Sequence, residues 1–339
     1  MSTASICILA TIIVYLVGML LIGVYCSKKN ETASDFYLGG RKLGPLVTAM
    51  SAEASDMSSY LLMGLPGLAY LSGVADVGWT VIGLAAGTYL NWLWTAKRLR
   101  RYTQITNSYT LPQFFSDRFR DKKNILAAMA AIFIIVFFVP YTASGFSACG
   151  KLFSTIFGMD YMTAMVISAI VIVGYTAAGG FMAASLTDFI QSIIMTFAVF
   201  AILIFATISA GGLGAVMENA KALPGYLSFT STHVAATGES APYGFLTIIS
   251  TLAWGIGYFG MPHILLRFMA IEDEKKLKLS RRVASAWVVV AMALAVMIGI
   301  VGRTLTQNGI IETLTGSDSE AVVTKVLAAL KEKLNAILR

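Results

Sequence analysis

Residues 51–67, SAEASDMSSYLLMGLPG, place two carboxylates and four serines where a membrane span would be expected. An isolated carboxylate in hydrocarbon costs several kcal/mol, so Asp56 should face protein, water or an ion. Gly64, Pro66 and Gly67 weaken or end a helix. A broken helix at membrane depth is tolerated where it lines a cavity or is buried in protein. The stretch therefore predicts an interrupted span with a polar centre.

The composition indicates a membrane protein with many spans. Of 339 residues, 57% are hydrophobic and 13% are charged, and the mean hydropathy is +0.75. A soluble domain carries roughly a quarter charged residues. The three cysteines form no CxxC pair, and His233 and His263 lie far apart, so neither a disulfide frame nor a zinc site is expected.

No nucleophile–base pair stands out, so we expect no enzyme. The basic residues lie mostly in short loops between apolar runs, so we expect no nucleic-acid partner.

Apolar runs of about 20 residues predict eight transmembrane helices. The expected spans are 5–26, 45–70, 74–96, 125–149, 160–180, 188–210, 243–265 and 284–304. No basic segment precedes the first run and no cleavage site follows it, so it is expected to be a retained span and not a signal peptide. Residues 211–242 are expected to form a loop. Residues 305–339 are polar, then weakly amphipathic, and too charged to span.

Lys and Arg are distributed unevenly about these spans. Of the 25, 18 fall in the loops after the first, third, fifth and seventh spans, and 7 fall on the opposite side. Cytoplasmic loops are enriched in Lys and Arg. We therefore expect a multi-pass protein of the plasma or inner cell membrane with its N-terminus outside and the basic loop at 97–123 in the cytoplasm.

The seventh span is also interrupted. It reads TLAWGIGYFGMPHILLRF (251–268), with three glycines and Pro262 in close succession and aromatic side chains beside them. Two interrupted spans, five apart in order, predict an inverted-repeat transporter with its site near the membrane midplane. The alternative is that the glycines only allow helices to pack closely.

Six motifs carry a resemblance to a known family. They are FYLGGRKLGP (36–45), SDMSSYLLMGLPG (55–67), TLPQFF (110–115), YTASG (141–145), GGF…TDFIQ (179–191) and WGIGYFGMPHILLRFMA (254–270). Together they resemble the sodium/solute symporter family and, within it, the sodium/proline symporters. The resemblance runs through residues 5–304 in order.

The resemblance implies an all-α membrane fold with a five-plus-five inverted-repeat core. Residues 1–30 would be an extra N-terminal helix, 45–210 the first repeat (spans 2–6) and 243–304 the start of the second repeat (spans 7–8). Residues 305–339 would be an extracytoplasmic tail, with the rest of the family core absent. The implied function is Na⁺-coupled symport of a small amino acid, with L-proline as the expected solute, in a lipid bilayer and with no obligate protein partner. An inactive truncated fragment and a membrane sensor or input module are the alternatives.

The resemblance also implies the site residues. Na⁺ is expected at the Ala54 and Met57 carbonyls, with Asp56 and Ser55 in the ion-coupling group. The residues expected to bind the solute are Ser58, Tyr60, Tyr141, Trp254, Tyr258 and Pro262. Arg41 and Asp188 are expected to take part in gating.

Simpler roles stay open for several residues. Asp188 follows Thr187 at a possible helix start and could be an N-cap. Arg41 could be only a cytoplasmic anchor. Glu53 is expected near the cytoplasmic end of its span, where it could be solvated. His263 is expected to be a hydrogen-bonded helix residue, and no basic side chain is expected near Asp56 in the span centres.

Overall fold

The computed structural model describes residues 3–337. Its α-helices, in chain order, are α1 (Thr3–Ser27), α2 (Ala33–Leu38), α3 (Pro45–Met57), α4 (Gly64–Ser72), α5 (Val74–Trp94), α6 (Ala96–Ile105), α7 (Leu111–Phe119), α8 (Ile125–Phe157), α9 (Tyr161–Ser209), α10 (Gly212–Ala222), α11 (Phe245–Ala253), α12 (Pro262–Ala270), α13 (Leu277–Gln307) and α14 (Val322–Ile337). The short 3-10 helices and strands are η1 (Gly39–Arg41), η2 (Ser58–Leu61), η3 (Trp254–Gly260), η4 (Glu274–Lys276), η5 (Gly316–Ala321), β1 (Ser231–Val234) and β2 (Glu239–Pro242).

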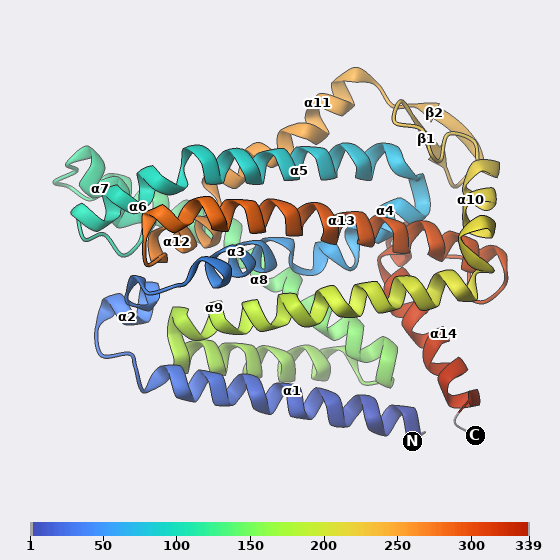
Figure 1. The fold of residues 1–339 in the computed structure, drawn as a ribbon, viewed down its shortest axis with the longest axis horizontal. Helices are drawn as coiled ribbons and strands as arrows, with labels where there is room; N and C mark the ends of the chain where they lie inside the picture. The colour runs from blue at the N-terminus through green and yellow to red at the C-terminus, as the bar shows by residue number, and fades with distance from the viewer. Residues whose placement is uncertain (1–2, 338–339) are drawn as a thin grey trace.

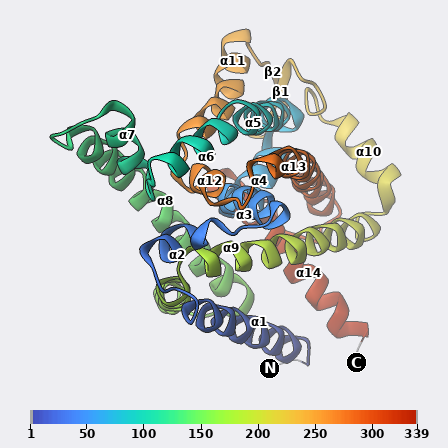
Figure 2. The same cartoon turned by 60° about the vertical axis from the view of Figure 1, so that its left-hand side comes forward.

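The long helices run along the long axis of an elongated bundle (Figure 1). In a view turned by 60°, α3, α4 and α13 lie in the middle, and α1, α7, α10, α11 and α14 lie at the periphery (Figure 2). The buried core follows this arrangement, since Ala52 of α3, Phe268 of α12 and Val288 of α13 are fully buried. Gly299 allows α13 to approach α4 closely, because an added Cβ would overlap the Pro66 carbonyl.

Four helical segments within residues 3–337 are long and apolar enough to cross a membrane. They are Ile6–Ser27, Ile125–Phe157, Tyr161–Ser209 and Glu274–Gln307. The pair Phe245–Gly260 and Pro262–Ala270, bent by 47°, makes a fifth if counted as one span. Hydrophobic side chains on their outer faces are exposed, such as Val14 on α1 at 73%. A helical, multi-pass membrane protein is therefore the fold class.

The expected interruption at 45–70 is present, but it lies earlier than the glycines predicted. α3 ends at Met57, and Ser58 has a positive φ of 46° with ψ of −150°. The GLPG motif instead begins α4, with Pro66 in its first turn. The first amides of a helix have no partner within it, so a proline costs no hydrogen bond there. The expectation that this motif ends the helix is wrong for that reason.

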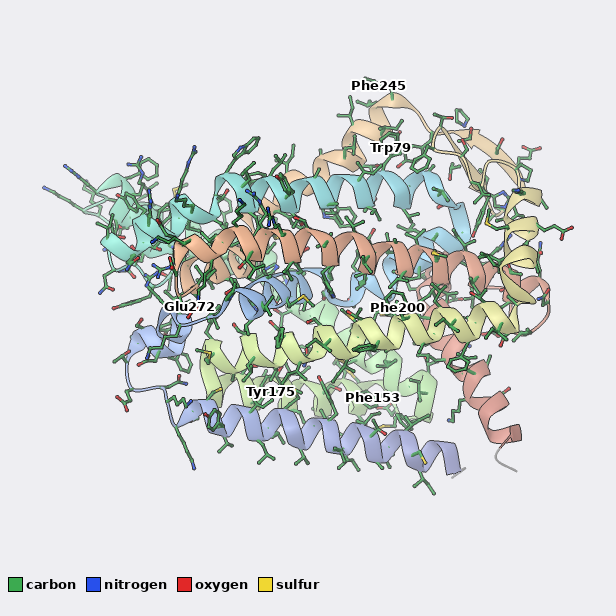
Figure 3. The ribbon with its side chains drawn as sticks, in the orientation of Figure 1. Trp79, Phe153, Tyr175, Phe200, Phe245 and Glu272 are labelled. Carbon is green, nitrogen blue, oxygen red and sulfur yellow. The ribbon has the colours of Figure 1, made fainter. Side chains whose placement is uncertain are left out.

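The fifth and sixth expected spans are joined within α9. The backbone hydrogen bonding makes α9 one helix of 49 residues, but Gly180 inside it has φ 64° and ψ −158°. Figure 1 shows two arms of α9 that fold back on each other, one beside α1. Tyr175 lies on that arm (Figure 3), where Gly23 of α1 packs against it. Glycine is needed at 180 because only it adopts this region without strain.

The segment 211–242 is more ordered than a loop. It contains α10 and an antiparallel hairpin, in which Ser231 pairs with Pro242 and Val234 with Glu239. The hairpin leads into α11, whose first residue, Phe245, is 77% exposed and lies at the edge of the molecule (Figure 3). The expectation of an unstructured connection is therefore wrong.

The seventh expected span is broken as its glycines indicated. α11 passes into η3, which contains the three glycines, and α12 begins at Pro262. Gly255 packs against backbone of α5, where a side chain would overlap the Gly83 carbonyl, so close packing explains this glycine. Nothing within 4 Å of the described residues would meet a Cβ on Gly257 or Gly260. Neither close packing nor a positive φ explains these two glycines.

Candidate functional site

A cavity of ≈ 450 Å³ lies where the two broken segments face each other. The first break supplies its polar wall, and η3 supplies aromatic side chains. α8 borders the cavity and contributes Tyr141. Of the residues expected to bind ion or solute, those that line the cavity are Asp56, Met57, Ser58, Tyr60, Tyr141, Trp254 and Tyr258.

Three expected site residues do not line the cavity. Pro262 is the first residue of α12, and its neighbour Met261 lines the cavity instead. The Ala54 carbonyl accepts the Ser58 amide as the last hydrogen bond of α3. Ser55 instead forms hydrogen bonds with Asp188 and Arg267. Fewer residues of the first break line the cavity than expected, because Ala54 and Ser55 point elsewhere.

A hydrogen bond from Tyr141 connects α8 to the end of α3. Its hydroxyl donates a hydrogen bond of 2.7 Å to the Ser55 carbonyl, and the Asp56 carbonyl lies 3.5 Å away. The last carbonyls of a helix have no partner within it. A side chain from another helix therefore satisfies one of the carbonyls that the break exposes.

The imidazole of His263 lies beside Asp56, where no basic side chain was expected. Nε2 of His263 lies 3.7 Å from Oδ1 of Asp56, and the two side chains are 15% and 6% exposed. The His263 ring stacks on Tyr141, with centroids 5.6 Å apart and planes 15° apart. Both ring nitrogens are buried and lack a hydrogen-bond partner among the described residues. The expectations of a hydrogen-bonded His263 and of no basic group near Asp56 are therefore wrong.

Aromatic rings form the opposite wall. Tyr60 and Trp254 meet edge to face with centroids 4.9 Å apart and planes 60° apart. Trp254 is 45% exposed, whereas Tyr258 is 3% exposed. Such rings offer a flat apolar surface with a polar tip. Together with the Asp56 side, they give the cavity one charged and one apolar wall.

A buried charge cluster lies beside the cavity on the other face of α3. The Arg267 guanidinium of α12 donates to Asp188 at 2.9 Å, to Ser55 at 2.7 Å and to Ser51 at 2.9 Å. Both serines also donate to Asp188, at 2.8 and 2.9 Å. Arg267 and Asp188 are 7% and 17% exposed at their side chains. We call these four residues the Arg267 cluster.

Two expectations change with this cluster. Asp188 lies inside α9, so the N-cap interpretation is wrong. The 18 Lys and Arg residues expected in loops include Arg267, but it lies in α12, one helical turn after His263 in an apolar sequence. An arginine in such a context is a signal for a buried pair, and its carboxylate partner lies 79 residues away in the chain.

Arg41 holds three segments together at the end of the bundle that carries α6 and α7. Its guanidinium donates to the carbonyls of Met269 at 2.8 Å, Thr103 at 2.9 Å and Ser108 at 2.8 Å. Arg41 itself adopts a positive φ of 55°. These bonds connect the residues before α3 to α12 and to the loop after α6. Arg41 thus links three segments through hydrogen bonds to their backbone carbonyls, and it is more than a cytoplasmic anchor.

The other end of the cavity reaches two charged side chains. Lys151 of α8 and Glu320 of η5 both line it and form an ion pair of 3.1 Å. Their side chains are 50% and 45% exposed. η5 is held there by close contact between Gly67 of α4 and the Ser319 carbonyl. No residue of the tail, 305–339, was expected in the site.

Residues 36–338 match the Sodium:solute symporter family. The chain belongs to this family. It is 45% identical over 296 residues to a sodium/proline symporter of Haemophilus influenzae and 42% identical over 295 residues to one of Escherichia coli. The matches cover 86% and 87% of this chain and 57% of each relative. A high-affinity proline transporter of Bacillus subtilis is 44% identical over 287 residues, which are 84% of this chain and 58% of the relative. The chain thus spans less than two thirds of the length of these relatives.

A solved structure of another protein has a similar fold. A Na⁺-coupled sialic acid symporter in a substrate-bound, outward-open state superposes with a TM-score of 0.75 over 96% of this chain and 70% of that one. The sequence identity is 17%, so the likeness concerns the fold alone. The resemblance found in the motifs is confirmed, and membership in a family of transporters agrees with the expectation that the chain is not an enzyme.

Proposed function

We propose that this chain carries the ion and solute site of a secondary transporter that takes up L-proline together with Na⁺. The observation that carries the proposal is the cavity between two broken helices, with Asp56 on one wall and aromatic rings on the other. The named substrates of the three proline-transporting relatives support the choice of solute. The inverted repeat, the eight spans and the orientation with the N-terminus outside remain part of the proposal.

The ion would bind at the carboxyl end of α3. The carbonyls there carry the negative end of the helix dipole, and Asp56 adds a full charge. Carboxylate, hydroxyl and carbonyl oxygens are the ligands of hard cations, and Asp56, Ser58 and the Met57 carbonyl are of this kind. Na⁺ at this place would compete with His263 for Asp56, so binding would alter how α3 and α12 meet.

The solute would lie between the first break and η3. The amino end of α4 borders the cavity through Gly64, and a helix amino terminus favours an anionic group such as a carboxylate. The apolar ring of proline would then pack against Tyr60 and Trp254. The side-chain hydroxyl of Ser58 is placed at the same break to bond a polar group of the solute.

Arg41 and the Arg267 cluster would act in gating. Both join elements from the two proposed repeats, since Arg41 precedes α3 and contacts α12, while Arg267 lies on α12 and contacts α3 and α9. One elementary charge moving through 100 mV releases about 2.3 kcal/mol. Na⁺ entry can therefore help to break such contacts as the transporter changes state.

The test is uptake of labelled proline into vesicles with an inward Na⁺ gradient or with choline in its place. Two proteins are compared: this chain alone and this chain joined to the part of the Haemophilus influenzae relative that it does not cover. Uptake that requires Na⁺ and falls at least about tenfold in Asp56→Asn supports the proposal, because the carboxylate is the only full charge on the ion wall. Proline uptake of equal rate in choline rejects the coupling.

A further inference from the structure

Glu53 is a buried carboxylate without a cationic partner. It is 2% exposed and lies on α3 one turn before Met57. Its Oε1 accepts a hydrogen bond of 3.0 Å from the Trp92 indole. Its Oε2 is buried without a partner in the described part of the chain, and no ion pair found there includes Glu53. The expectation that Glu53 is solvated is therefore wrong, and a carboxyl in this place must bind either a proton or a cation.

α5, which carries Trp92, also carries two buried side-chain oxygens without a hydrogen-bond partner among the described residues. Thr88, Asn91 and Trp92 share one face of α5, because they are three and four positions apart. Thr88 and Asn91 are 3% and 1% exposed, and the Thr88 side chain lies next to the Glu53 carboxylate. The Asn91 amide nitrogen donates to the Tyr258 carbonyl at 2.7 Å, which leaves its oxygen as the free end. Thr88 Oγ1 and Asn91 Oδ1 are both buried and unpartnered across residues 6–332.

These oxygens match a hard monovalent cation. A buried anion without compensation is costly, and a water molecule would not neutralise it. Carboxylate, hydroxyl and amide oxygens are the ligands of hard cations, whereas soft metals prefer sulfur and imidazole. A single carboxylate carries one negative charge, which a monovalent ion balances. The Trp92 hydrogen bond holds the other carboxylate oxygen and so fixes the direction of Oε2.

We propose that Glu53, Thr88 and Asn91 form a second Na⁺ site, distinct from the one at Asp56. It lies about one helical turn from Asp56, between α3 and α5, and faces away from the Arg267 cluster. The choice of Na⁺ among monovalent cations rests on the proposed function. The site would let one ion bridge side chains of α3 and α5 while the other acts at the cavity.

The test uses the purified full chain in detergent, with NaCl replaced by choline chloride at constant ionic strength. Bound ²²Na⁺ per chain is measured by scintillation proximity, and Trp92 reports occupancy through its fluorescence because its indole bonds Glu53. Subtracting the response of a Trp92→Phe variant isolates this signal. Glu53→Gln removes the charge, Thr88→Val removes one oxygen at similar volume, and Glu218→Gln is the control on the exposed face of α10.

We expect Glu53→Gln to bind one Na⁺ fewer than the parent chain, with at least about tenfold weaker binding at this site and loss of the Trp92 signal. Thr88→Val should weaken the Na⁺ affinity reported by the Trp92 signal about threefold to tenfold. This change corresponds to the loss of one interaction about as strong as a hydrogen bond. Glu218→Gln should match the parent. The melting temperature should rise with Na⁺ less in Glu53→Gln than in the parent.

The proposal is overturned if Glu53→Gln and Thr88→Val titrate with Na⁺ as the parent does. It is also overturned if the Trp92 signal follows pH and ignores Na⁺, which would assign a proton to Glu53. Should Glu53→Gln fail to fold, Thr88→Val alone decides. Failure of the proposed function is separate: Na⁺-independent proline uptake would reject the symport while Na⁺ binding at Glu53 still stands.

Discussion

Replacing Arg267 with glutamine should destabilise the chain strongly. The substitution leaves the Asp188 carboxylate, 17% exposed, without its cation. Breaking a buried pair by removing one partner costs about 3–5 kcal/mol. Ser51 and Ser55 still donate to Asp188 in the variant, so part of the charge stays solvated by hydroxyls. We therefore expect a loss of about 3 kcal/mol, at the lower end of that range.

A double-mutant cycle separates this pair from the rest of the packing. Asp188→Asn combined with Arg267→Gln leaves no uncompensated charge, so the double variant should be more stable than the sum of the single effects predicts, by about 2 kcal/mol. The free energy of unfolding is measured by SDS titration in mixed micelles. Arg101→Gln is the matched control, because Arg101 pairs with Glu274 while 59% of its side chain is exposed. Surface pairs contribute less than about 1 kcal/mol.

Two results would contradict the reasoning. One is an Arg267→Gln variant whose stability stays within about 1 kcal/mol of the parent, the level of the surface control. The other is strict additivity of the two single variants. Either result would mean that water reaches the Arg267 cluster and that its charges are not coupled.

Further predictions concern the breaks and the end of the bundle near α2. Tyr141→Phe removes the 2.7 Å hydrogen bond to α3 and should weaken Na⁺ binding about fivefold in a ²²Na⁺ assay, in line with about 1 kcal/mol for one hydrogen bond. Gly255→Ala should abolish the folded fraction seen by size exclusion, because its Cβ overlaps α5, whereas Gly257→Ala should be tolerated. The Thr32 hydroxyl lowers the pKa of Asp35 below its ordinary 3.8, so this carboxylate stabilises α2 above about pH 3.8. The parent chain should therefore show more hydrogen-exchange protection in α2 than Asp35→Asn does. This difference should vanish as the pH falls through the lowered pKa of Asp35.

The sequence predicted the site better than its surroundings. Both breaks and the cavity roles of Asp56, Ser58 and Trp254 could be inferred, because polar residues and glycines in an apolar span violate a strong physical rule. The position of the first break could not be inferred from Gly64, since the same residues that end one helix can begin another. Ser58, without any helix-breaking side chain, makes the turn.

The contacts that hold the site together join segments far apart in the chain. Arg267 meets Ser51 across 216 positions, and Lys151 meets Glu320 across 169. Hydrophobic periodicity reports which face of a helix is apolar, and it does not report which distant carboxylate faces an arginine. The Arg267 cluster and the role of η5 therefore required the folded structure.

The faces of α3 explain how one short helix can serve three partners. Successive residues of an α-helix are turned by about 100°. Ser51 and Ser55 thus point within about 40° of each other, toward Asp188, whereas Asp56 points about 140° and Glu53 about 200° away from Ser51. Any rotation of α3 that releases the serines from Asp188 must also move Asp56 relative to His263 and Glu53 relative to Trp92. Ion binding on one face is therefore coupled to the contacts on the other two through the rigid helix itself, and no separate relay of residues is needed.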